Sequence, residues 1–139
     1  MTYFELVEVF DNLINKPRDE NIFNKIEDAS RDFNGNILGR FIDRIKIFIN
    51  ARLDKDIFKI SESIYKSQSV EEFNLDLIEF MKEINYLKEF SKFSILPVDE
   101  KNNINVIIDK RKEDVINNLL EISNSLSNDV LINLIKSYK

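Results

Sequence analysis

Glycine and proline are scarce in this chain, whose 139 residues contain only two of each. A β-sandwich or barrel has many tight turns, which commonly use these residues. Their scarcity therefore favours long helices joined by short loops. The sequence has no internal repeat and no low-complexity linker, and its length is typical of one domain. We expect residues 1–139 to form a single all-α or mostly α domain, a compact bundle of five or six helices.

Apolar residues recur every three or four positions along most of the chain, which is the spacing of one helix face. The pattern is clearest in residues 36–66, which are predicted to form one long helix, or two with a break near Leu53 and Asp54. Thr2 and Ser69 each precede a glutamate by three residues, which is the spacing of a capping box at a helix start. The other predicted helices cover residues 3–15, 17–33, 70–91 and 109–123, and a short last helix begins near 130.

Two positions predict where helices begin or end, and a third leaves an alternative open. Pro17 suits the first position of a helix, where a missing N–H has no partner to lose. Gly35 can take a positive φ and is predicted to stop the preceding helix. Pro97 blocks a continuing helix, and the β-branched run 104–108 resembles a strand. Residues 94–108 therefore form either one small hairpin, with Asp109 capping the next helix, or an early start of that helix.

The residue types present limit the chemistry. The chain has no His and no Cys, which removes histidine general acid–base catalysis, the catalytic triads and thiolate metal sites. Neither glycine-rich phosphate-binding pattern occurs. A carboxylate site for Mg²⁺ in an all-α nucleotide hydrolase is the remaining enzyme class, and its spacing is broken here, because Leu75 stands where a third acid is needed after Glu71 and Glu72, one residue before Asp76. We therefore expect a non-enzymatic protein without cofactor or metal.

Four acidic residues share one face of the helix predicted over 70–91. Their spacing of four, three and four residues places them in neighbouring turns, where like charges repel. The functional interpretation is a docking strip for a basic protein partner, and the alternative is a solvated face of an acidic protein. The four residues are Glu72, Asp76, Glu79 and Glu83.

A second group of charges lies in residues 40–59, where six basic residues outnumber three acidic ones. Arg40, Arg44 and Arg52 are the candidates for contact with phosphate or nucleic acid. The alternative is that they pair with carboxylates inside the bundle. The apolar run of Phe90, Phe93 and their neighbours before Pro97 either packs against the hairpin or forms an exposed contact patch.

Small size, a net charge of −5 and the four-residue acidic face favour a non-catalytic protein-binding module. An inhibitor fits best, such as an immunity protein, an antitoxin or a phage counter-defence factor. The alternatives are a nucleic-acid-associated helical subunit that uses residues 40–59, and the Mg²⁺-dependent hydrolase. Without a secretory signal or a long apolar segment, a cytoplasmic protein without membrane contact is expected.

Overall fold

The computed structural model describes all 139 residues, which form six α-helices, one short 3-10 helix and no strand. The predicted all-α bundle is therefore confirmed. No helix combines the length and the apolar character that crossing a bilayer requires. In chain order the elements are α1 (Tyr3–Leu13), α2 (Ile22–Ser30), α3 (Gly35–Lys66), α4 (Val70–Lys88), η1 (Glu89–Ser91), α5 (Val98–Ser125) and α6 (Asp129–Lys136).

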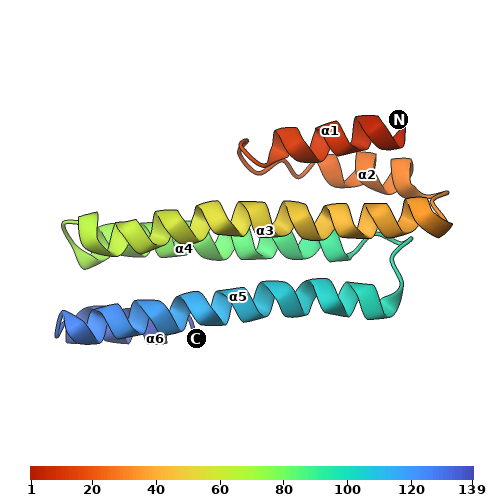
Figure 1. The fold of residues 1–139 in the computed structure, drawn as a ribbon. Coiled ribbons are helices and arrows are strands. Elements are labelled where there is room, and N and C mark those ends of the chain that lie inside the picture. The colour runs from red at the N-terminus through yellow and green to blue at the C-terminus, as the bar shows by residue number, and fades with distance from the viewer.

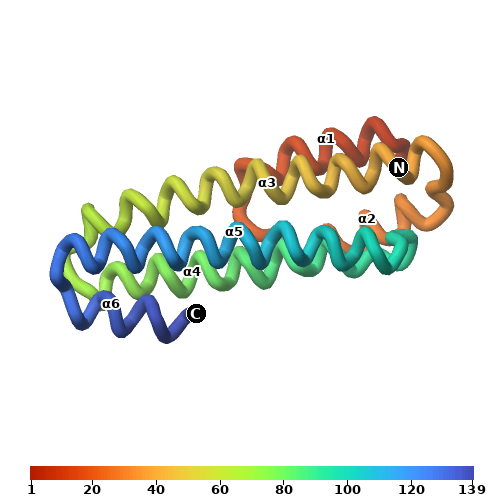
Figure 2. Tube along the Cα trace, turned by 60° about the horizontal axis from the view of Figure 1, so that its bottom comes forward, coloured from red at the N-terminus to blue at the C-terminus, as the bar shows by residue number.

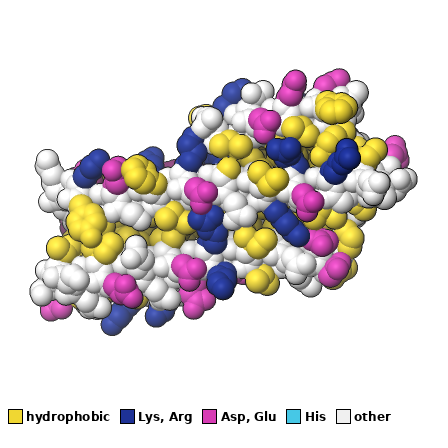
Figure 3. Space-filling model, viewed as in Figure 1, with side chains coloured by type: hydrophobic (Ala, Val, Ile, Leu, Met, Phe, Trp, Pro, Cys, Tyr) yellow, Lys and Arg dark blue, Asp and Glu magenta, His cyan; other side chains and the backbone are white.

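The three long helices α3, α4 and α5 run along the length of the molecule, and α6 folds back beside α4 and α5 at one end (Figures 1 and 2). The shorter α1 and α2 form a further layer that covers only the part of α3 nearest its N-terminus (Figure 1). The outline of the molecule consequently has a step midway along α3 (Figure 3). Beyond this step, α1 and α2 no longer cover α3 and α4, and α6 packs beside α4 at that end.

The local start signals act as the sequence predicts. The Thr2 hydroxyl accepts from the Glu5 N–H at 3.2 Å, and the Ser69 hydroxyl accepts from the Glu72 N–H at 3.1 Å. Gly35 has the expected positive φ, +53°, but it does not stop the preceding helix, because α2 already ends at Ser30 and Gly35 is the first residue of α3. The possible break near Leu53 and Asp54 is absent. No glycine or proline stands there, and α3 continues as one helix of 32 residues.

Of the two alternatives for residues 94–108, the early start of the next helix is confirmed, because α5 begins at Val98. The hairpin is wrong, and so is the role of Asp109 as a cap, since Asp109 lies inside α5. Pro97 ends the preceding segment as expected. Ile104 and Ile108 lie one helical turn apart and are both fully buried. Burial of this face against α3 and α4 outweighs the strand preference of β-branched residues, which is weak and depends on context.

The second helix also starts later than predicted, at Ile22 and not at Pro17. Residues 14–21 form a loop, and their backbone groups bond to side chains of α3 and α4. The Tyr86 hydroxyl, for example, accepts from the Asp19 N–H at 3.2 Å. Tertiary hydrogen bonds replace the helical ones that a start at Pro17 would have supplied.

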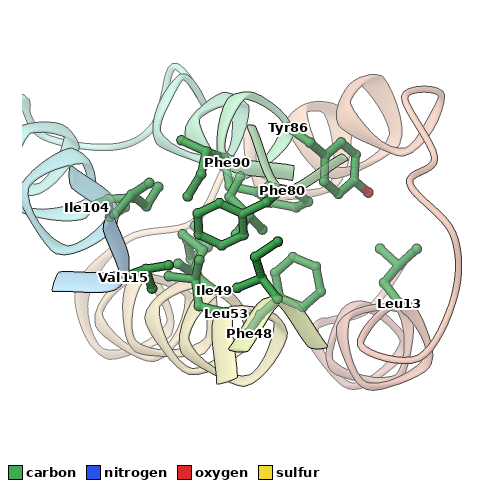
Figure 4. Close-up of a cluster of buried hydrophobic side chains, with 14 of the residues drawn as sticks. Leu13, Phe48, Ile49, Leu53, Phe80, Tyr86, Phe90, Ile104 and Val115 are labelled. Atoms are coloured by element: carbon green, nitrogen blue, oxygen red, sulfur yellow. The ribbon is translucent and has the colours of Figure 1, made fainter. Parts of the chain in front are cut away.

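Aromatic side chains join the outer layer to the long helices. Phe90, fully buried in η1, lies 4.8 Å from Phe48 of α3 and 4.8 Å from Phe23 of α2, measured between ring centroids. Phe48 in turn lies 5.3 Å from Phe10 of α1. Figure 4 shows Phe48 and Phe90 within the buried cluster, together with Phe80, Leu53 and Ile104. Four elements therefore meet at one aromatic cluster.

Truncation of a side chain at the centre of this cluster should destabilise the fold. We expect Phe90→Ala to lower the free energy of unfolding by about 3–5 kcal/mol, because it removes a fully buried ring and leaves a cavity. Phe58→Ala is the matched control, since Phe58 is 66% exposed, and it should change stability by less than about 0.5 kcal/mol. Urea unfolding followed by circular dichroism measures both, and equal midpoints for the two variants would contradict this view of the core.

Candidate functional site

A polar cleft of about 540 Å³ lies at the step, where the loop between α1 and α2 meets α3 and α4. Only three of its 14 lining residues are hydrophobic. The acidic lining residues are Asp56, Asp76, Glu79 and Glu83, and the basic ones are Lys16, Arg18, Arg52, Lys55 and Lys59. The cleft is therefore lined mainly by charges of both signs.

An ion pair between Arg52 of α3 and Glu83 of α4 forms the buried end of the cleft. The guanidinium donates from Nε and Nη2 to the two carboxylate oxygens at 2.7 and 2.8 Å. Both residues are buried, 6% and 4% exposed. Burial by itself lowers the pKa of Arg52, but the hydrogen bond and negative charge of Glu83 outweigh it, so the pKa of Arg52 is raised. Arg52 stays charged, as a bidentate pair requires.

The remaining nitrogen of Arg52 holds the end of α1. Its Nη1 donates to the carbonyl oxygens of Leu13 at 2.6 Å and Lys16 at 2.8 Å. The last carbonyls of a helix have no partner within the helix, and α1 has no basic residue in its last turn. A side chain from α3 therefore caps the C-terminus of α1.

Helix α4 holds the rest of the loop 14–21. Arg18 donates to Glu79 at 2.7 Å and also lies 3.7 Å from Glu83. The hydrogen bond from Arg18, followed by that from Lys82, lowers the pKa of Glu79. Tyr86, one turn beyond Glu83, exchanges hydrogen bonds with the backbone of Asp19. One face of α4 thus places the loop that forms a wall of the cleft.

Asp56 differs from the other carboxylates of the cleft because it has neither an ion pair nor a hydrogen-bond donor. Its Oδ2 is buried, and no protein group donates to it. Burial, and then the negative charge of Glu83, raise the pKa of Asp56 to about 6. The positive charges of Arg52, Lys59 and Arg18 oppose this shift without cancelling it. Asp56 is therefore a partly buried carboxylate with one oxygen that accepts no hydrogen bond from the protein.

The four predicted acidic residues lie on one face of α4, but the structure separates their roles. Glu72 is exposed and accepts from the Gln68 N–H at 2.9 Å. Asp76 is half-buried and accepts from the Ser63 hydroxyl, and Glu79 is exposed and bound to Arg18. The prediction that all four residues are solvent-exposed is wrong at Glu83, because Glu83 is buried, paired with Arg52, and cannot contact a partner.

The three predicted arginines do not form one surface. Arg40 is exposed and makes no ion pair, and Arg44 lies 3.6 Å from Asp11 of α1. Arg52 is directed into the bundle, as described above, and cannot contact a phosphate from outside. The alternative of intramolecular pairing thus holds for Arg44 and Arg52.

The structure also locates the apolar run before Pro97 and the carboxylates considered for a metal site. Phe90, Phe93 and Leu96 are buried, so the predicted exposed apolar patch is wrong, since these side chains fill the space between η1, α2 and α3. Glu71 is exposed on α4. No group of three or more acidic residues is arranged to hold a metal ion.

The sequence pattern contained a signal for Asp56 that the prediction did not use. Asp56 follows Ile49 by seven residues and precedes Ile60 by four, which places it in register with buried positions of α3. Arg52 and Glu83 likewise stand one helical turn from buried residues, Arg52 four positions after Phe48 and Glu83 four positions before Leu87. A charge in the apolar register of a long helix indicates a buried polar group that needs a partner.

Comparison with known proteins adds no relative, because no family model, no curated protein and no solved structure matches the chain.

Breaking the buried ion pair should destabilise the fold. We expect Arg52→Met or Glu83→Leu to lower the free energy of unfolding by about 3–5 kcal/mol, because each leaves the opposite charge buried and unpaired. The double variant should lose less than the sum of the two, since neither charge remains. Arg111→Met is the control: it removes the pair with exposed Asp54 and should cost about 1 kcal/mol or less. Strict additivity in the cycle would show that the pair is not coupled.

Asp56 should make stability depend on pH. Since the pKa of Asp56 in the folded state, about 6, lies above its ordinary value of 3.8, folding favours the protonated form. The penalty is then absent below about pH 4, grows as pH rises to about 6 and is complete above it. Asp56→Asn should stabilise the protein by about 1 kcal/mol at neutral pH, after allowance for solvent screening, and by nothing at about pH 4.

Asp54→Asn, on the exposed face of the same helix, is the control for this pH effect. This variant should not stabilise the protein at neutral pH, because it weakens the pair with Arg111. Urea unfolding at a series of pH values measures both variants. A stability difference for Asp56→Asn that does not vary with pH would contradict the assignment.

Proposed function

We propose that this chain is a non-catalytic protein-binding module that docks a basic partner against the exposed acidic residues of α4 at the edge of the cleft. The observation that carries the proposal is the exposure of Glu72 and Glu79 on one face of α4. The net charge of −5 also favours a basic partner, because a negative surface attracts a positive partner and speeds its association.

The covering layer defines where such a partner would sit. Because α1 and α2 end midway along α3 and α6 packs elsewhere on α4, a protein surface could contact the exposed Glu72 and Glu79 without displacement of any helix. Asp76, half-buried between Glu72 and Glu79, would contribute charge at the edge of the contact. An inhibitor, such as an immunity protein, an antitoxin or a phage counter-defence factor, is the finer form of this proposal.

Neutralising the exposed acids should slow association with the partner without unfolding the protein. We expect the double variant Glu72→Gln, Glu79→Gln to bind more slowly at low salt, with the difference shrinking as screening increases. Glutamine at position 72 can still cap the start of α4, as glutamate does. The control variant, Glu113→Gln with Asp114→Asn, makes the same change in net charge at two exposed positions of α5.

The measurement starts with capture from cells of the source organism at low salt, with mass spectrometry of the bound proteins and association kinetics for each. A basic protein retained by the wild type and by the control, but lost or slowed with the α4 variant, supports the proposal. Identical capture and kinetics for all three proteins would overturn it.

A further inference from the structure

Two carboxylates and three ammonium groups of the cleft have no ionic partner: Asp56, Asp76, Lys16, Lys55 and Lys59. Asp76 accepts from the Ser63 hydroxyl, and Lys16 lies in the loop between α1 and α2. Asp56 has the buried oxygen that no protein group meets. Lys59 makes no hydrogen bond or ion pair, and Lys55 bonds only to the uncharged side chain of Asn15. Asp56, Lys55 and Lys59 lie within five positions of α3, and all line the cleft.

The two arginines of the cleft are engaged with other groups. Arg52 gives its Nε and Nη2 to Glu83 and its Nη1 to two carbonyl oxygens. Arg18 donates to Glu79 and faces Glu83. Neither arginine makes a hydrogen bond to the buried oxygen of Asp56, although both lie close enough to influence it.

The size and lining of the cleft limit the kind of ligand. A volume of about 540 Å³ lies within the range of small-molecule sites, roughly 300–1,000 Å³. Such sites are mostly apolar, whereas this one is lined by charges, so an apolar ligand would leave those groups without hydrogen bonds. The ligand must itself be polar.

A ligand of a single charge matches only part of the cleft. An anion would meet Lys55 and Lys59 but would bring its charge close to Asp56, and a cation would meet Asp56 but approach both lysines. A ligand with both charges, separated by a short aliphatic chain, pairs each group with its opposite. The aliphatic chain would lie along Ile60 and Phe80, which are among the few hydrophobic lining residues.

We propose that the cleft binds a zwitterion of the ω-amino acid type, with its ammonium group on Asp56 and its carboxylate on Lys55 and Lys59. The same chemistry is present in a free ω-amino acid and in a polypeptide that ends in lysine. Glu79 lines the cleft and also belongs to the proposed docking surface, but the residues that would hold the ligand lie on α3. The two proposals are therefore tested by different variants, and each can fail without the other.

The test uses 6-aminohexanoate as the probe, titrated into the full chain at low salt and about pH 7.5, where Asp56 is ionised. We expect saturable shifts of the backbone amide signals of residues 55–60 and 76–83 in the nuclear magnetic resonance spectrum. Hexylamine lacks the carboxylate and hexanoate lacks the amine, and each should bind about tenfold more weakly or worse. Equal binding of all three compounds, or no saturable shift at millimolar concentration, would overturn the proposal.

Variants of the cleft make the assignment specific. Asp56→Asn, which is expected to fold stably, should abolish binding of 6-aminohexanoate, and Lys55→Gln with Lys59→Gln should weaken it about tenfold. Asp54→Asn with Lys112→Gln, which changes the same residue types outside the cleft, should leave binding unaltered. Unchanged binding by Asp56→Asn would overturn the proposal.

A peptide with C-terminal lysine and its C-terminal amide distinguish the two sources of the ligand. If the free-acid peptide binds more tightly than 6-aminohexanoate and amidation removes this binding, the site serves a polypeptide end. If the peptide binds no better than its amide while 6-aminohexanoate still binds, the site serves a free small molecule. Both results support the zwitterion site, which is already decided by the probe and the variants.

Discussion

The buried ion pair between Arg52 and Glu83 is the interaction on which the rest of the arrangement depends. A single guanidinium connects α3 to α4 through the carboxylate, and both to the end of α1 through Leu13 and Lys16. A buried ion pair is not by itself a source of stability, because desolvation of two charges offsets their attraction. Its role here is one of position: the donors of Arg52 are satisfied only when α1 ends at this point along α3.

The position of the step follows from that constraint, and the cleft follows from the step. If α1 and α2 extended further, they would cover the groove between α3 and α4 and expel the solvent around Asp56. Because the outer layer stops at Arg52, the groove changes within one helical turn from a sealed core to an open, charged cleft. The aromatic cluster around Phe90 lies on the sealed side, and Asp56, Lys55 and Lys59 lie on the open side.

The sequence predicted the elements better than it predicted the site. The helix starts at Thr2 and Ser69 depend on side-chain hydrogen bonds within four residues, so the local sequence is sufficient to identify them. The acidic face of α4 was placed on the correct side of its helix, but its accessibility was wrong at Glu83. Spacing shows which residues share a face, but it does not show that an arginine 31 residues earlier in the chain lies opposite that face.

The sequence by itself determined that this chain is helical, that its helices are long, and which residues of each helix lie together. Those properties depend on turn residues, capping and periodicity, all of which act over a few positions. Only the tertiary structure decided that residues 98–109 are helical, that residues 14–21 are a loop, and that Glu83 is buried while Glu79 is exposed. These outcomes depend on which faces meet across the bundle, because burial and pairing between distant segments outweigh local preference wherever the two conflict.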